Sequence, residues 1–307
     1  MKISVIIPAY NCREMLEYTV QALETQDFPK TDFEVIVIDD GSTDGTADYL
    51  QKYRGSLQLK PVINGENLGR ARSRNLGIDA AQGELIVFLD ADTEPAHQDF
   101  LQLHWAAQST GRKVAVGLRK FHPEFKKTGI MRYLEKRGGA KYPPGSDLPG
   151  RYFVSCNASL PKAVLIEEGG FDPRLLHYGG EDLELGHRLS LRLPLRSLPS
   201  ALCWHRHYRQ LSEVLRVTEV FGEYSLPFIF HRHPELMKQL SFENINIKNT
   251  RDLFIKFICI KPIFSLVKLL VKFDFMPLCI YNYLIFRSYR EGYLRSLKVC
   301  KSKESSK

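Results

Sequence analysis

The chain has 307 residues, of which 44% are hydrophobic and 25% are charged, a balance typical of a globular protein rather than a disordered one. Its 43 Lys and Arg outnumber 35 Asp and Glu, which leaves a net charge of +8 and favours an anionic partner such as a nucleotide, a membrane surface or nucleic acid. The six Cys are scattered without a CxxC pair, so neither a zinc site nor a disulfide framework is indicated. No signal peptide is predicted, and a cytosolic location is expected.

Strand and helix patterns alternate along the first half of the chain. Apolar runs predict strands over residues 3–10, 33–40, 59–66 and 83–92, and helical spacing is found over 13–26, 45–53 and 71–82. This order predicts an α/β fold with an open, mostly parallel sheet and helices on both faces. In such sheets, ligands bind at the carboxyl ends of the strands.

The pattern changes after about residue 111. Strands are expected over 113–121 and 196–208, a helix is expected after the double glycine at 179–180, and the chain after 209 is mostly helical in pattern. Gly, Pro and Lys in "KRGGAKYPPG" predict a loop between these elements.

The strand in "GELIVFLDADTEP" ends in two carboxylates, Asp90 and Asp92, separated by Ala91. One interpretation is a solvated strand end in which Asp92 or Thr93 caps a following helix. The other is a divalent metal bound by oxygen ligands and shared with a phosphate. The tripeptide alone leaves both open.

Two further motifs follow strands in the same half of the chain. In "VIDDGSTDGT", a turn that caps the next helix explains residues 42–45 but not Asp39 and Asp40, whose carboxylates can accept hydrogen bonds from a base or a ribose. In "NLGRARSRN", Asn67 and Gly69 precede a helix whose N-terminal amides favour an anion. The arginines of that helix, Arg72 among them, form either an anion site or a solvated basic face.

The segment "GGFDPRLLHYGGEDLELGHRL" places Glu181 and Asp182 beside a double glycine at the start of a helix. Capping explains one acidic residue there but not two, and a carboxylate so placed can take a proton from a hydroxyl. A late strand, "CWHRHY", adds His205 and His207. Either imidazole could complete an acidic metal site, although a strand histidine is more often structural.

These motifs, in this order over roughly residues 1–210, resemble the inverting family 2 glycosyltransferases. The resemblance implies the glycosyltransferase-A fold with a nucleotide-sugar-binding half at 1–110, an acceptor-binding and catalytic half at 111–235, and a helical extension at 236–307. It also implies a metal-dependent transfer of a sugar from a nucleotide-sugar, with a UDP-sugar as the default donor, to a hydroxyl of a glycan or lipid-linked acceptor in cell-surface polysaccharide synthesis.

The resemblance also implies roles for individual residues. Pro8, Ala9 and Tyr10 are expected to contact the nucleoside of the donor, and Asp40 is expected to contact its base with Asp39 in support. Asp90 is expected to lie near the ribose, with Ala91 beside it. The donor is also expected to contact Asn67, Gly69 and Arg72, in and after the loop that precedes the basic helix. Asp92 is expected to bind Mg²⁺ or Mn²⁺ at the diphosphate, with His205 as a further metal contact and His207 as the rival. Asp182 is expected to be the catalytic base, with Glu181 beside it.

One motif of the family's processive synthases, Gln-x-x-Arg-Trp, is absent after Asp182, so transfer of one sugar per encounter is expected. Near the carboxy terminus, residues 254–290 are very apolar but interrupted by lysines and by Pro262 and Pro277. They predict either a helix packed on the catalytic domain or an in-plane helix on the cytosolic face of a membrane.

Two other functions compete with transfer. A sugar-nucleotide-binding protein without turnover would need neither Asp92 nor Asp182. A nucleic-acid-binding protein is suggested only by the net charge and lacks any recognised motif, so no nucleic-acid partner is expected.

Overall fold

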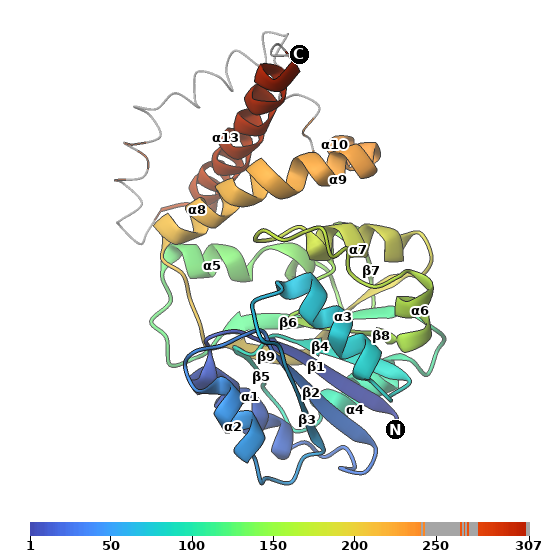
Figure 1. Ribbon diagram of the computed structural model, residues 1–307. Helices are drawn as coiled ribbons and strands as arrows, with labels where there is room; N and C mark the ends of the chain where they lie inside the picture. Colours follow the sequence, from blue (N-terminus) through green and yellow to red (C-terminus); the bar gives the residue numbers. More distant parts are fainter. Residues whose placement is uncertain (241, 243–264, 266, 268, 270–275, 305–307) are drawn as a thin grey trace. The chain divides into compact units, whose positions relative to one another are not determined.

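The structure is a computed structural model that describes residues 1–240, 242, 265, 267, 269 and 276–304 (Figure 1). It divides the chain into two compact units. The first contains residues 1–126, 135–176 and 181–208, and the second contains residues 127–134, 177–180 and 209–307. The expected division into donor, acceptor and extension segments is a functional one and stays a prediction.

A single sheet of nine strands forms the first unit, in the order β3-β2-β1-β4-β8-β6-β9-β5 with β7 paired to β9. The strands are β1 (Ile3–Ala9), β2 (Phe33–Asp39), β3 (Leu59–Ile63), β4 (Leu85–Leu89), β5 (Thr93–Pro95), β6 (Val114–Phe121), β7 (Asp147–Leu148), β8 (Asn157–Pro161) and β9 (Leu195–His205). The first four strands in the order are parallel to one another. Strand β8 runs antiparallel to both of its neighbours, so the sheet is mixed beyond β4.

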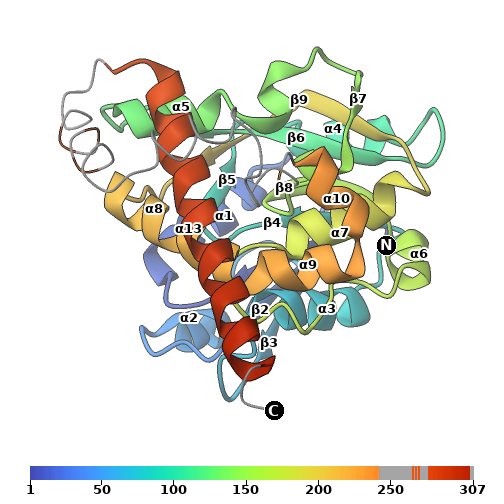
Figure 2. The same ribbon diagram turned by 90° about the horizontal axis from the view of Figure 1, so that it is seen from above.

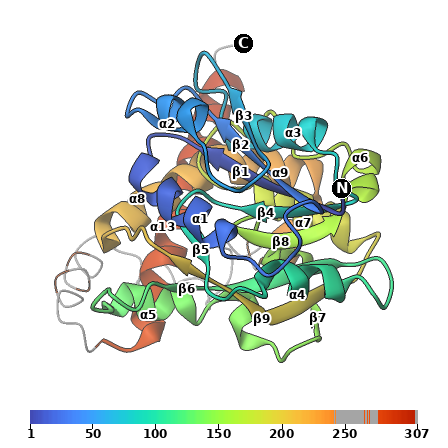
Figure 3. The ribbon, with the colours of Figure 1, turned by 90° about the horizontal axis from the view of Figure 1, so that it is seen from below.

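Helices cover both faces of this sheet, as the alternating pattern predicted. They are α1 (Arg13–Glu24), α2 (Thr46–Lys52), α3 (Arg70–Ala80), α4 (Phe100–Ala107), α6 (Lys162–Glu167) and α7 (Glu181–Ser190). Figure 2 shows α3, α6 and α7 on one face, and Figure 3 shows α1, α2 and α4 on the other. Each set packs on its own apolar cluster, because successive strand side chains point to opposite faces.

The sequence did not predict β5 and α4. Strand β5 is only three residues long and contains Pro95. For these reasons its sequence also fits the residues that precede a helix. It pairs antiparallel with β9, with Thr93 opposite His205. Helix α4 packs through Phe100 and Leu101 on the same cluster as α1.

The second unit is helical. It contains most of α5 (Gly129–Glu135), together with α8 (Leu211–Val220), α9 (Leu226–Arg232), α10 (Pro234–Gln239) and α13 (Leu278–Glu304), and one π-helical turn over Phe221–Ser225 joins α8 to α9. Its core includes Tyr133 and Tyr281, whose rings stack with centroids 5.9 Å apart. The expected helical extension is confirmed over α13.

The membrane interpretation concerns a different part of this segment. Most of residues 254–275 lie outside the described residues, and the lysine-bearing helix expected there lies among them. In the part of the chain that the structure describes, none of the helices combines the length and the apolar character needed to cross a bilayer.

Candidate active site

Three polar motifs meet at one edge of the sheet because β1 lies between β2 and β4 and runs parallel to both. Ala9, the last residue of β1, is opposite Asp39, the last residue of β2. The Asp40 amide donates to the Ala9 carbonyl at 2.8 Å. The carboxyl ends of β1, β2 and β4 therefore bring the predicted nucleoside and strand-end residues together, as the topology requires.

The side chain of Asp40 fixes the loop before α3 at this edge of the sheet by hydrogen bonds. One of its oxygens accepts the Leu68 amide and the other accepts the Gly69 amide, both at 2.9 Å, and Asn64 donates to it at 3.0 Å. Gly69 has a φ of +86°, a value that favours glycine, and it opens helix α3. Asp40 thus fixes the loop that leads into α3, and its expected contact with the base stays a prediction.

The carboxylate of Asp39 accepts fewer hydrogen bonds than that of Asp40 and can accept more from a ligand. Among the described residues, its side chain accepts one long hydrogen bond, from the Ser42 amide at 3.3 Å. Asp44, in the same turn, accepts the amides of Arg13 and Thr46 and so ties the starts of α1 and α2 together. This agrees with the interpretation of residues 42–45 as a capping turn.

The other predicted donor residues surround these carboxylates. Pro8 and Ala9 are in β1, and Tyr10, which follows the strand, is 52% exposed. A side chain at Gly41 would lie 3.0 Å from the Asn67 nitrogen, so the loops after β2 and before α3 touch. The expected contacts of these residues with a nucleoside stay predictions.

The turn after β4 is held by threonines. The Asp90 amide donates to Thr93 Oγ1 at 3.0 Å, and that hydroxyl donates back to the Asp90 carbonyl at 2.8 Å. From α1, Thr19 Oγ1 donates to the Ala91 carbonyl at 2.9 Å. The chain then continues directly into β5, so capping of a following helix does not account for Asp92.

The pairing of β5 with β9 places Asp92 beside His205. His205 Nε2 lies 3.1 Å from Asp92 Oδ2. In the described part of the chain, Asp92 Oδ1 and His205 Nδ1 are both buried without a hydrogen-bond partner. His207 is the next imidazole, with its ring centroid 6.3 Å from that of His205.

The electrostatics keep the Asp92 carboxylate ionised. Burial acts to raise the pKa of Asp92, but the hydrogen bond from His205 and the positive charges of Arg119 and His207 lower it to about 2. A buried oxygen without a partner is costly unless another group satisfies it. The unpaired oxygen of Asp92 is a donor that suits Mn²⁺ or Mg²⁺, so this carboxylate fits a divalent cation, and the imidazole of His205 beside it is a donor more typical of transition metals than of Mg²⁺.

Arg74 is a site residue that the sequence did not select. Its guanidinium is 2% exposed and lies 2.8 Å from Asp90 and 3.3 Å from Glu181. Burial acts to lower the pKa of Arg74, but the charges of Asp90, Asp182 and Glu181 raise it above its usual value. Arg72, the arginine chosen instead, is exposed.

Helical periodicity was the signal that could have separated the two arginines. Ala71, Arg74 and Ile78 are buried and lie three and four residues apart on α3, which places them on one face of the helix. The Arg74 guanidinium also lies over the Phe171 ring, 5.4 Å from its centroid. Arg72 lies on the opposite face.

Glu181 and Asp182, in the first turn of α7, have different surroundings. Glu181 is 5% exposed and pairs with Arg74. Asp182 Oδ2 accepts the Ser155 amide at 3.2 Å, while within the described residues Oδ1 is buried without a partner. Burial, together with the charge of Glu181 and against that of Arg74, raises the pKa of Asp182 to about 6. Of these two acids, Asp182 is therefore the one whose carboxylate has an oxygen available to accept a proton.

The loop before α7 is fixed to α3. Asn75 donates to the Phe171 carbonyl at 2.8 Å and accepts the Phe171 amide at 2.9 Å. Gly169 and Gly170 both have positive φ, a backbone conformation that favours glycine and lets the chain turn sharply here. These contacts hold the arginine-bearing helix and the GGFD loop as one rigid piece.

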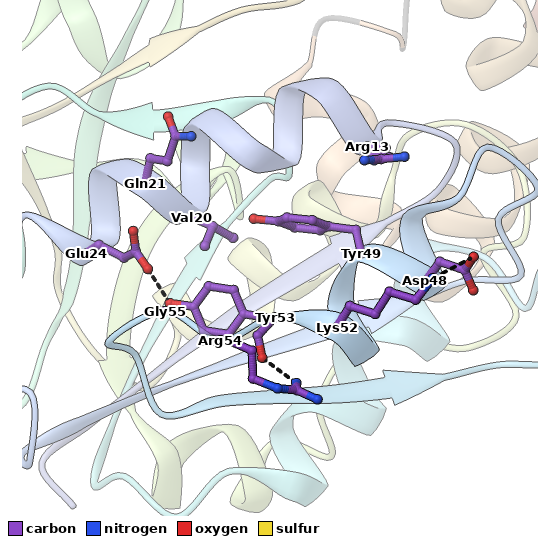
Figure 4. Close-up of a pocket in the computed structure, with 10 residues that line it drawn as sticks. All are labelled: Arg13, Val20, Gln21, Glu24, Asp48, Tyr49, Lys52, Tyr53, Arg54 and Gly55. Carbon is purple, nitrogen blue, oxygen red and sulfur yellow. Dashed lines mark hydrogen bonds and ion pairs between the residues drawn. The ribbon is translucent and has the colours of Figure 1, made fainter.

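A groove of about 460 Å³ lies away from these residues, between α1 and α2 (Figure 4). Tyr49, Tyr53, Arg13 and Lys52 line it, and none of the predicted site residues does. The Tyr53 hydroxyl donates to Glu24 at 2.5 Å across it.

Comparison with known sequences gives a consistent result. The profile of Glycosyl transferase family 2 matches residues 4–168. The validoxylamine A glucosyltransferase of Streptomyces hygroscopicus subsp. jinggangensis is 33% identical over 216 residues, which are 61% of this chain and 51% of that protein. The poly(ribitol-phosphate) beta-N-acetylglucosaminyltransferase TarS of Staphylococcus aureus is 43% identical over 93 residues, 30% of this chain and 16% of that protein. The chain thus spans about half the length of the first relative and less of the second.

Two solved structures have a similar fold. TarS 1-349 in complex with UDP-GlcNAc superposes with a TM-score of 0.59 at 20% identity, covering 96% of this chain and 92% of that one. The mannosyltransferase PcManGT from Pyrobaculum calidifontis, in complex with GDP-Man and Mn²⁺, superposes with a TM-score of 0.61 at 18% identity, covering 94% and 86%. At these identities the likeness concerns the fold.

Proposed function

Because the chain belongs to glycosyltransferase family 2 and has the glycosyltransferase-A fold, we propose that it transfers one sugar from a nucleotide-sugar to an acceptor hydroxyl with inversion at the anomeric carbon. One observation carries the proposal. Arg74 joins Asp90, in the turn that holds Asp92, to Glu181, the neighbour of Asp182. The proposed cation ligand Asp92 and the separate carboxylate of Asp182, whose pKa is raised, thus belong to segments that Arg74 links.

In this proposal the donor lies along the carboxyl ends of β1, β2 and β4. Tyr10 and the loop at Asn67 contact the nucleoside. Asp39 has the greater free acceptor capacity for the base, since both oxygens of Asp40 are occupied by backbone amides. UDP-sugars are the first donors to test, supported by the neighbour solved with UDP-GlcNAc, with GDP-sugars second, supported by the neighbour solved with GDP-Man.

Asp92 and His205 would hold a divalent cation, which would offset the negative charge of the leaving diphosphate. The neighbour with Mn²⁺ supports this choice of cofactor. Asp182 would accept the proton of the attacking hydroxyl through its unpaired Oδ1, and a pKa of about 6 leaves it ionised at neutral pH. Arg74 would hold Glu181 and Asp90 in place and keep the cluster of carboxylates from repelling one another.

The acceptor is proposed to be a cell-surface glycan or its lipid-linked precursor. The relative that acts on poly(ribitol-phosphate) supports a surface polymer as the class. We propose peripheral attachment to the cytosolic face of a membrane from the sequence of residues 254–275 alone. Removal of the chain after residue 251 should release the protein from membranes while donor binding persists. Full-length protein that stays in solution without lipid or detergent would contradict this.

A thermal-shift screen of nucleotide-sugars tests the proposal, because a ligand that binds only the native state raises its apparent stability. We expect at least one UDP- or GDP-sugar to raise the Tm in Mn²⁺ and to lose this effect in EDTA. Failure of every donor to do so would overturn the assignment. A donor that binds but is never consumed would instead favour a binding protein without turnover.

A further inference from the structure

The end of the segment 136–155, from Gly150 to Ser155, lies along helix α7 in the first unit. A side chain at Gly150 would lie 2.5 Å from the Gly186 carbonyl oxygen, and one at Gly186 would lie 2.3 Å from the Gly150 oxygen. The backbones therefore meet at close range, as only glycine allows. Further along, the Ser155 amide donates to Asp182. Gly186 is one helical turn, roughly 6 Å of rise, from Asp182, so this segment passes the proposed base.

The same segment is also fixed to the sheet. Leu148 is buried in β7, which pairs with β9. The Gly145 amide donates to the Ser197 carbonyl at 2.8 Å, and the Ser197 amide donates to Ser146 at 3.0 Å. The predicted loop is therefore held in place beside α7, and its exposed side chains form a defined surface.

Four residues give this surface its chemistry, and we refer to them as the basic aromatic surface: Lys141, Tyr142, Arg151 and Tyr152. The two tyrosine rings are half-buried, with centroids 5.4 Å apart. The Arg151 guanidinium lies over the Tyr152 ring, 5.1 Å from its centroid. Burial acts to raise the pKa of Tyr152, but Arg151 and Lys141 lower it below its usual value. Both cations therefore act on the same phenol.

The positive charge of this surface is not neutralised locally. Lys141 and Arg151 are exposed, and no carboxylate of the described residues forms an ion pair with them. The nearby acids are used elsewhere: Glu135 accepts the Phe121 amide at 2.8 Å, and Asp147 pairs with Arg196 at 3.1 Å. The surface thus presents aromatic rings and two cations without a carboxylate partner among the described residues, and Arg151 and Tyr152 belong to the stretch of chain whose Ser155 amide contacts Asp182.

We infer that the basic aromatic surface binds an acceptor that carries negative charges along a chain of sugar or polyol units. This inference rests on the proposed function and specifies the class of acceptor that the same site would bind. Aromatic rings suit the apolar faces of sugars, and the flanking cations suit phosphate or carboxylate groups. A neutral acceptor would gain no ionic interaction with Lys141 and Arg151.

The experiment compares the full-length protein with Lys141→Gln/Arg151→Gln and with the control Lys52→Gln/Arg54→Gln, which removes the same charge from exposed positions on and next to α2. The probes are a glycerol-phosphate oligomer, a galacturonate oligomer of similar length and a neutral dextran oligomer. Binding is measured by titration at low and high salt. Donor affinity is measured separately with UDP-sugars and Mn²⁺.

We expect one or both anionic oligomers to bind at least about tenfold tighter than dextran, with the difference shrinking at high salt. The first double variant should lose about tenfold in that affinity while keeping its donor affinity, and the control should lose neither. Preference for the phosphodiester or for the uronate would tell which anion the acceptor carries.

Three results would overturn the inference. They are equal binding of neutral and anionic oligomers, unchanged binding in the first double variant, and loss of donor affinity in that variant, which would assign the cations to the donor diphosphate. If no nucleotide-sugar were bound or consumed, the proposed function would fail independently of oligomer binding.

Discussion

Arg74 Nη2 lies 2.8 Å from Asp90 Oδ1, and the guanidinium that makes this contact is almost completely buried. Asp90 belongs to the turn after β4, and Arg74 belongs to α3, which also touches the GGFD loop through Asn75. The pair therefore couples the proposed donor edge to the loop that leads towards the proposed base. Removal of Arg74 would leave the buried carboxylate of Glu181 without its cation.

Replacement of Arg74 should therefore destabilise the protein. Arg74→Gln leaves Asp90 and Glu181 without their cation, and breaking a buried pair in this way typically costs about 3–5 kcal/mol. Urea unfolding at pH 7 measures the loss. Arg72→Gln, on the exposed face of the same helix, is the control and should change stability by less than about 0.5 kcal/mol. Equal effects of the two substitutions would show that the bridge is not structural.

Replacement of Asp182 should slow transfer without preventing donor binding. Asp182→Asn keeps the volume of the side chain but removes the proton acceptor, so transfer should fall by about 10² to 10⁴, mainly in kcat. The fold should persist, since Asn also serves in the first turn of a helix. Glu181→Gln is the matched control and should cost less. A larger loss in Glu181→Gln, or near-normal turnover in Asp182→Asn, would assign the base elsewhere.

The pH dependence of kcat/KM should follow the same carboxylate. A base must be deprotonated to act, and the pKa of Asp182 is about 6. Activity should therefore be flat above about pH 7 and fall about tenfold per unit below pH 6. Arg74 lowers this pKa, so Arg74→Gln should move the acidic limb to higher pH, whereas Arg74→Lys should move it less. A limb that stays in place in Arg74→Gln would argue against Asp182 as the titrating group.

The raised pKa of Asp182 also affects stability. Its folded pKa lies above the usual value of 3.8, so the folded state binds the proton more tightly than the unfolded state. The contribution of this group to stability is therefore greatest below about pH 4 and is lost as the pH rises through 6. Asp182→Asn should be at least as stable as the wild type at pH 7, and a clearly lower urea midpoint there would contradict this.

Replacement of Asp92 should abolish the metal dependence of donor binding. Asp92→Asn weakens one ligand of the proposed cation, and donor affinity in Mn²⁺ should fall by about 10- to 100-fold. EDTA should then have little further effect on the variant. Asp48→Asn, an exposed acid on α2, is the control. Titration of a UDP-sugar with and without Mn²⁺ measures both, and an unchanged metal dependence in Asp92→Asn would remove Asp92 from the site.

Much of the first unit could be predicted from the sequence because its strands are strong signals. Buried parallel strands read as continuous apolar runs, and β1, β2 and β4 are such runs. The acidic residues that follow β2 and β4 then had to share one edge. The parallel order of these strands therefore predicts that Asp39, Asp40, Asp90 and Asp92 follow strand ends at the same edge of the sheet.

The rest of the fold and of the site depends on contacts between residues far apart in the sequence, which no local sequence pattern indicates. The antiparallel insertion of β8 between β4 and β6 depends on long-range pairing. Strand β5 is too short to show periodicity, yet its pairing with β9 is what brings Asp92 to His205. The motif itself does not distinguish Arg74 from Arg72, because only the buried face of α3 separates the two side chains.

The central claim is that this site turns over a nucleotide-sugar with a divalent cation. The most direct measurement is release of nucleoside diphosphate from a panel of UDP- and GDP-sugars by the full-length protein, with the three oligomers named above supplied as acceptors of the sugar, first with Mn²⁺ and then with EDTA. We expect at least one donor to be consumed in Mn²⁺ and to be left intact in EDTA. Tight binding of a donor with no release of nucleoside diphosphate, or release that EDTA does not affect, would contradict the account.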